Sequence, residues 1–189
     1  MLKIILFGDS ITAGYENGLT DFRLNELLES QNPDIKTINA GIPGDTTEGA
    51  LKRVDAHVLK YQPDIVTVFF GANDVATYSG ITKELYETNL RELIARIGEE
   101  KVILIGPPFA RQGHYEALER PLINIEEFNQ KVQIIAEEKG VSYINLLEVM
   151  LEKEAEHYLQ SDGLHFSMAG YQLLGDLIHE KIKEKKKER

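Results

Sequence analysis

A serine, a histidine and an aspartate in this sequence stand where they could combine into a nucleophile and its base. Ser10 follows the apolar run Ile4–Phe7 and a Gly-Asp pair, which predicts a hydroxyl on a sharp turn at the end of a strand. Asp162 precedes His165 by three residues in a predicted loop, a spacing that lets a carboxylate orient the imidazole. Taken alone, a serine in this position more often has an ordinary turn or helix-capping role.

Two other predicted strands also end in turns. The strand at 36–40 runs into Gly41, and the strand at 65–70 runs toward Asn73. Parallel strands all point the same way, so Ser10, Gly41 and Asn73 are expected on one rim of the sheet, where ligands bind in open α/β folds. Each turn is ordinary by itself, and it is their convergence that favours a catalytic site.

Apolar strands alternate with amphipathic helical segments along the whole chain. Such alternation predicts a parallel sheet with helices on both sides. No repeat, low-complexity linker or shift in composition marks a boundary, so residues 1–189 are expected to form a single domain. The expected strands lie at 4–7, 36–40, 65–70, 102–105 and 141–145.

The composition excludes several classes of function. Hydrophobic residues make up 42% and charged residues 28%, as in globular proteins, and the formal net charge of −10 disfavours a nucleic-acid partner. The absence of cysteine excludes disulfides, a thiol nucleophile and cysteine-based metal sites. Because no signal peptide or membrane-length apolar run is recognised, membrane insertion is not expected and the expected location is cytoplasmic.

Four short segments resemble the four blocks of the SGNH (GDSL) hydrolase family, and they occur in the family's order. They are Gly8–Ile11, Asn39–Gly44, Gly71–Asp74 and Asp162–His165. Ile11 replaces the usual leucine of the first block, a change that conserves volume and leaves the chemistry intact. The resemblance implies a flavodoxin-like three-layer α/β/α sandwich with five parallel strands in the order 2-1-3-4-5.

The resemblance also implies a role for each matching residue. Ser10 would be the nucleophile, His165 the general base, and Asp162 the residue that orients the histidine. The oxyanion hole would consist of the Ser10 and Gly41 backbone N–H groups and the Asn73 side-chain amide. No cofactor or metal is implied, because a serine with its base forms and hydrolyses the acyl-enzyme without one.

The expected function is hydrolysis of small carboxylic esters, with short acyl groups favoured because the chain has no obvious large lid. A carbohydrate O-deacetylase, a thioesterase or a lysophospholipase remains an alternative for the same site. A non-catalytic ligand-binding module and a flavodoxin-like nucleotide binder are alternatives from other classes. His114, in the long loop at 109–122, is expected to contact substrate. The sequence indicates no particular oligomeric state.

The acidic residues beside the candidate site and the remaining histidines have simpler interpretations. Asp9 and Asp74 each adjoin a candidate residue, so their side chains should point elsewhere and hold the turns by hydrogen bonds. Three further histidines, His57, His157 and His179, lie on predicted helices and are given no catalytic role.

Overall fold

A parallel β-sheet organises the chain. The computed structural model describes residues 1–113 and 119–187. Within them, five parallel strands pair in the order β2-β1-β3-β4-β5, which confirms the predicted order. The strands are β1 (Leu2–Gly8), β2 (Ile35–Gly41), β3 (Ile65–Phe69), β4 (Val102–Ile105) and β5 (Ser142–Ile144).

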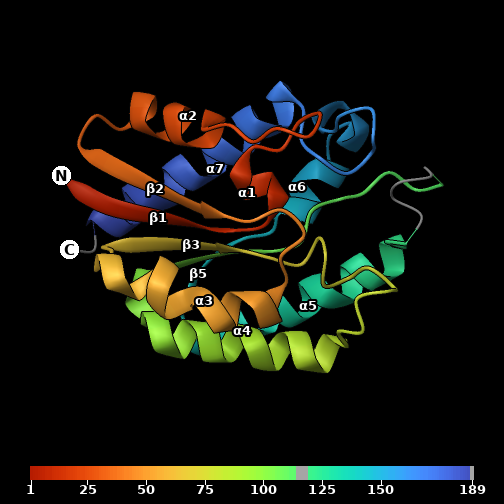
Figure 1. Cartoon of the computed structure of the whole chain (residues 1–189), viewed down its shortest axis with the longest axis horizontal. Coiled ribbons are helices and arrows are strands. Elements are labelled where there is room, and N and C mark those ends of the chain that lie inside the picture. Colours follow the sequence, from red (N-terminus) through yellow and green to blue (C-terminus); the bar gives the residue numbers. More distant parts are fainter. Residues whose placement is uncertain (114–118, 188–189) are drawn as a thin grey trace.

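Helices cover both faces of the sheet, so the chain has the three-layer arrangement expected (Figure 1). On one side α2 packs against α7, and on the other α4 packs between α3 and α5. No helix of the described residues is both long and apolar enough to cross a lipid bilayer. The helices are α1 (Ser10–Ala13), α2 (Arg23–Gln31), α3 (Thr47–His57), α4 (Lys83–Ile97), α5 (Leu122–Lys139), α6 (Leu146–Leu151) and α7 (Met168–Lys187), with 3₁₀ turns at Leu59–Tyr61, Glu99–Lys101 and Ala155–Tyr158.

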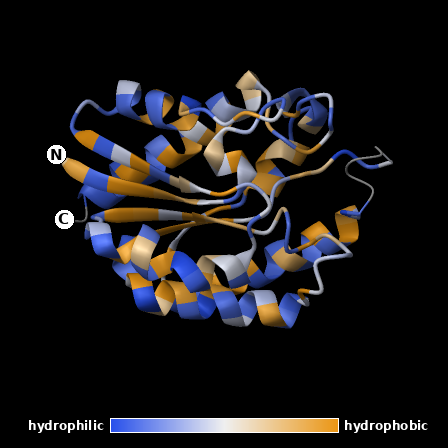
Figure 2. Ribbon diagram, in the orientation of Figure 1, coloured by the Kyte–Doolittle hydropathy of each residue, from blue (hydrophilic) through white to orange (hydrophobic). Residues whose placement is uncertain are grey.

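The core lies between the sheet and the two helical layers. Every residue of β3 and β4 is buried, because helices cover both faces of these central strands. The hydrophobic residues follow the strands and the inner faces of the helices (Figure 2). Each large apolar side chain removed from water contributes about 1.5–3 kcal/mol, so this core is the main source of stability.

Side-chain caps fix where the helices begin. Thr46 Oγ1 accepts from Gly49 N–H at the start of α3, and Ser167 Oγ accepts from Gly170 N–H at the start of α7. Asp9 caps α1 directly after β1, so the chain passes from the strand into the first helix through this one residue.

The register of the strands brings their carboxyl ends together. Gly8, at the end of β1, pairs with Gly41 of β2 on one side and with Phe69 of β3 on the other. The turns that follow these three strands therefore meet on one rim of the sheet, as the sequence predicted.

Candidate active site

Ser10, His165 and Asp162 form a continuous chain of hydrogen bonds. Ser10 Oγ lies 2.9 Å from His165 Nε2, and His165 Nδ1 lies 2.6 Å from Asp162 Oδ2. Although 155 residues separate the serine from the histidine, the fold brings them into contact. This geometry allows the imidazole to remove the hydroxyl proton while the carboxylate stabilises the resulting imidazolium.

The turn between β1 and α1 positions the serine. Asp9 Oδ1 accepts from Ile11 N–H at 2.9 Å, which fixes the first turn of the helix. Glycine is required just before it, because a Cβ on Gly8 would lie 2.6 Å from Phe69 O. Ser10 is the first residue of α1, so its N–H has no acceptor within the helix, and no other described residue accepts from it.

A compact loop before α7 positions the aspartate and the histidine. Asp162 Oδ1 accepts from the backbone N–H groups of Leu164 and His165, both at 2.9 Å. Burial by itself would raise the pKa of Asp162, but these hydrogen bonds and the His165 side chain hold the pKa below its ordinary value. The group is therefore a carboxylate at neutral pH, as its proposed partner requires.

Tyr15 and Gln160 support the histidine, and neither was predicted from the sequence to have a role. The Tyr15 ring lies 4.6 Å from the His165 ring, centroid to centroid. Gln160 Nε2 donates to Tyr15 O and to Phe166 O, both at 2.9 Å. These contacts tie the loop after α1 to the loop that carries the histidine. The feature of the sequence that could have indicated this contact is the position of Tyr15 close to Ser10.

The Gly41 N–H, which the sequence predicted to be an oxyanion donor, has a hydrogen-bond partner within its own segment. It donates to Asn39 Oδ1 at 2.9 Å, and is therefore already engaged. The glycine has a steric role instead, because a Cβ there would lie 2.4 Å from Ala13 N and 2.8 Å from Asp9 O. Its absence of a side chain lets β2 end against α1.

Gly44, three residues later, has an available N–H. Its φ of +78° belongs to the left-handed region that favours glycine, and nothing lies within 4 Å of the position a Cβ would take. Among residues 1–113 and 119–187, none accepts a hydrogen bond from this N–H. The sequence motif contained this glycine, but only the turn's conformation distinguishes it from Gly41.

Asn73 uses its amide nitrogen in one short and one long hydrogen bond. Its Nδ2 donates to Asp45 O at 2.9 Å, whereas its second contact, to Asp9 Oδ2, is long at 3.4 Å. On the other side of the amide, Asn73 Oδ1 lies 3.5 Å from Arg120 Nη2, while Arg120 Nε donates to Ala72 O at 2.6 Å. Because arginine can only donate, it favours the orientation that leaves Nδ2 on the side of Asp9 and Asp45.

The two acidic residues next to the site hold turns, as predicted. Burial raises the pKa of Asp9 to about 7, against the lowering effect of the Ile11 N–H. Burial also raises the pKa of Asp74 to about 6, although Thr47 donates its N–H and its hydroxyl to Asp74 Oδ1 at 2.9 and 2.5 Å. Asp74 thereby fixes the start of α3 to the turn after β3.

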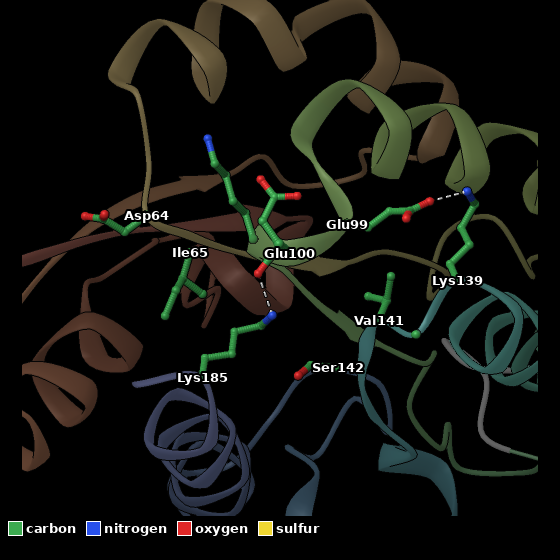
Figure 3. Close-up of a pocket in the computed structure, with 10 residues that line it drawn as sticks. Asp64, Ile65, Glu99, Glu100, Lys139, Val141, Ser142 and Lys185 are labelled. Carbon is green, nitrogen blue, oxygen red and sulfur yellow. Dashed lines mark hydrogen bonds and ion pairs between the residues drawn. The ribbon is translucent and has the colours of Figure 1, made fainter. Parts of the chain in front are cut away.

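A cavity of about 800 Å³ lies at the opposite end of the sheet (Figure 3). It is lined by Ile65 and Ser142, which begin β3 and β5, whereas the candidate site follows the strands' carboxyl ends. Two of its lysines have partners in the chain: Lys139 pairs with Glu99 at 2.6 Å, and Lys185 Nζ donates to Glu100 O at 2.7 Å. The cavity is therefore not part of the candidate site at Ser10.

The predicted substrate contact at His114 lies outside the described residues. The other histidines that were given no role, His57, His157 and His179, lie on α3, on the 3₁₀ turn Ala155–Tyr158 and on α7, with no contact to Ser10 among the described residues.

Comparison with known proteins places this chain in a family. The model of the GDSL-like lipase/acylhydrolase family matches residues 6–173. The isoamyl acetate-hydrolyzing esterase of Saccharomyces cerevisiae is 27% identical over 92% of this chain and 83% of its own length. Esterase TesA of Pseudomonas aeruginosa is 28% identical over 88% of this chain and 80% of its own length.

A solved structure agrees with these sequence matches. The lipase/acylhydrolase of Enterococcus faecalis is 43% identical, with a TM-score of 0.93, over 97% of this chain and 96% of that chain. The match extends over all four sequence blocks, so the family resemblance inferred from them is confirmed. The chain belongs to the GDSL-like lipase/acylhydrolase family and is a serine carboxylic ester hydrolase.

Proposed function

We propose that the enzyme hydrolyses small esters with short acyl groups by a Ser-His-Asp mechanism. The observation that carries the proposal is the unbroken hydrogen-bonded path from Ser10 Oγ through His165 to Asp162, with distances of 2.9 and 2.6 Å. His165 Nε2 takes the hydroxyl proton as Ser10 Oγ attacks the ester carbonyl carbon. Asp162 holds the proton on Nδ1 and stabilises the imidazolium.

The tetrahedral intermediate then collapses to an acyl-enzyme. The imidazolium of His165 gives its proton to the leaving alkoxide, and the alcohol departs. In the second half of the cycle His165 removes a proton from the water that attacks the acyl-enzyme, and it passes that proton to Ser10 Oγ as the carboxylic acid leaves. Each proton that the imidazole takes is thus passed to the departing oxygen, and no cofactor enters the cycle.

We propose that the oxyanion hole is made by Ser10 N–H, Gly44 N–H and Asn73 Nδ2. Among the described residues nothing accepts from the N–H of Ser10 or of Gly44, and the second contact of Asn73 Nδ2, to Asp9 Oδ2, is long at 3.4 Å. These observations support the assignment, as does the engagement of the Gly41 N–H by Asn39. Because these donors already have their positions before the reaction, they can stabilise the developing negative charge without a rearrangement of the protein.

Replacing Asn73 with alanine should lower kcat by about 10²–10³-fold and leave KM within about threefold of wild type. The reason is that the amide hydrogen binds the charge of the transition state more strongly than the neutral ester carbonyl. Steady-state kinetics with p-nitrophenyl acetate measure both constants. Asn129→Ala is the matched control, because this buried amide donates to Pro107 O and Ile125 O instead. A rise in KM without a fall in kcat would make Asn73 a substrate-binding residue.

The acyl group is expected to be short, from acetyl to hexanoyl. The resemblance to an esterase that hydrolyses isoamyl acetate supports this size. A series of p-nitrophenyl esters from acetate to palmitate should show kcat/KM highest at the short end and declining beyond hexanoate. A higher kcat/KM for palmitate than for acetate would contradict the proposal.

A further inference from the structure

Arg53 of α3 places a guanidinium group beneath the turns that carry the oxyanion donors. Its side chain is only 11% exposed. Nη2 donates to Gly8 O at 3.0 Å and Nη1 donates to Ala40 O at 2.7 Å. These two carbonyls stand at the ends of β1 and β2, directly before the turns that lead to Ser10 and Gly44.

The same guanidinium also holds the residue that follows Gly44. Arg53 Nε lies 2.7 Å and Nη2 lies 2.6 Å from Asp45 Oδ2, in an ion pair whose two side chains are equally buried. The Asp45 backbone carbonyl in turn accepts from Asn73 Nδ2 at 2.9 Å. One side chain is therefore linked, directly or through Asp45, to the ends of β1, β2 and β3.

The form of the arginine side chain suits this position. Its flat fork offers five N–H donors, so it can serve two carbonyls and a carboxylate at once, whereas a lysine ammonium offers three donors from a single point. The guanidinium carbon also lies 4.5 Å from the centroid of the Phe7 ring and 5.9 Å from that of Phe70. Arg53 Nη1 also lies 3.3 Å from His57 Nδ1.

We propose that Arg53 is the positioning residue of the oxyanion hole. It holds the 41–45 turn against the ends of β1 and β2, so that Gly44 N–H and Asn73 Nδ2 converge on the position that the oxyanion of the Ser10 adduct takes. The inference rests on the oxyanion hole proposed above. Arg53 itself touches no substrate, and it acts through Asp45 and the strand-end carbonyls.

Replacing Arg53 with methionine should lower kcat for p-nitrophenyl acetate by about 10²-fold and change KM by less than about threefold. Arg53→Lys should recover about tenfold of that loss, because one cation can still reach part of the acceptor set. Arg96→Met is the matched control. Arg96 also donates to a carbonyl, Leu51 O at 3.0 Å, and pairs with Asp55 at 2.6 Å, but it joins α3 to α4. This control should keep wild-type kcat.

A double substitution separates positioning from general stability. Because Arg53 and Asn73 serve the same oxyanion, the loss of kcat in Arg53→Met/Asn73→Ala should be smaller than the product of the two single losses. If Arg53→Met does not fold, Asp45→Asn removes the charge that holds the guanidinium and should show the same selective fall in kcat. Thermal unfolding establishes which variants are folded at the assay temperature.

Two outcomes would overturn the inference. One is a folded Arg53→Met or Asp45→Asn enzyme with the kcat of the Arg96→Met control, and the other is fully multiplicative losses in the double variant. Failure of the underlying mechanism would look different, because Ser10→Ala would then retain activity. Loss of activity in Ser10→Ala together with wild-type kcat in Arg53→Met would refute the role of Arg53 alone.

Discussion

Replacing Ser10 with alanine is expected to lower kcat on the order of 10⁶-fold, the size of effect seen when a serine hydrolase loses its nucleophile. The hydroxyl lies 2.9 Å from His165 Nε2, and the proposed covalent route has no other nucleophile. What remains should be the small rate that the oxyanion donors provide by stabilising attack of water. Initial rates with p-nitrophenyl acetate at high enzyme concentration measure this residual activity.

The control for this substitution is Ser142→Ala at the start of β5, at the other end of the sheet. It should keep wild-type kcat. Thermal unfolding of Ser10→Ala should show a folded protein, because the deleted hydroxyl is bonded only to the imidazole among the described residues. A folded Ser10→Ala enzyme with a tenth or more of the wild-type kcat would be incompatible with a seryl acyl-enzyme.

Replacing Asp162 with asparagine is expected to lower kcat by about 10⁴-fold. Oδ1 accepts two backbone N–H groups, from Leu164 and His165, so the amide oxygen of the asparagine should take that place. The NH₂ group then faces His165 Nδ1, which must become an acceptor. The ring proton moves to Nε2, and the imidazole can no longer take the proton from Ser10.

Asp176→Asn on α7 is the matched control, since this exposed carboxylate bonds to Gln31 and Gln172 at the surface. Stability gives a second readout. The pKa of Asp162 is lower in the folded protein than its ordinary value of 3.8. The stability it contributes is therefore present above that value and is lost as pH falls through the folded pKa. Asp162→Asn should lack this part of the acid-induced loss. An Asp162→Asn enzyme that keeps half of the wild-type kcat would refute the role of Asp162 in orienting His165.

The parts of this site that the sequence predicted are those that local rules determine. Ser10 follows a buried apolar run, and a parallel sheet places the ends of its strands on one rim, so the meeting of Ser10 with the Asn73 turn followed from the order of elements. The spacing between Asp162 and His165 is short enough for the loop to bring them into contact by itself.

The parts that the sequence missed depend on where individual hydrogen bonds point. Gly41 and Gly44 are both glycines of one turn, and only the Asn39 side chain decides which N–H is engaged. The partners of Arg53 include the carbonyls of Gly8 and Ala40, which carry no sequence signature. One feature of the sequence did indicate that Arg53 is buried. It follows the buried Ala50 by three residues and so lies on the inner side of its helix.

The most direct test of the central claim is to identify the atom that becomes covalently modified. A fluorophosphonate reacts with an activated serine by forming an Oγ–P bond and releasing fluoride, and mass spectrometry of the digested enzyme locates the adduct. The mechanism predicts one adduct, on the peptide that contains Ser10, and none in the Ser10→Ala enzyme. An active wild-type enzyme that remains unmodified, or that carries its adduct on another residue, would contradict it.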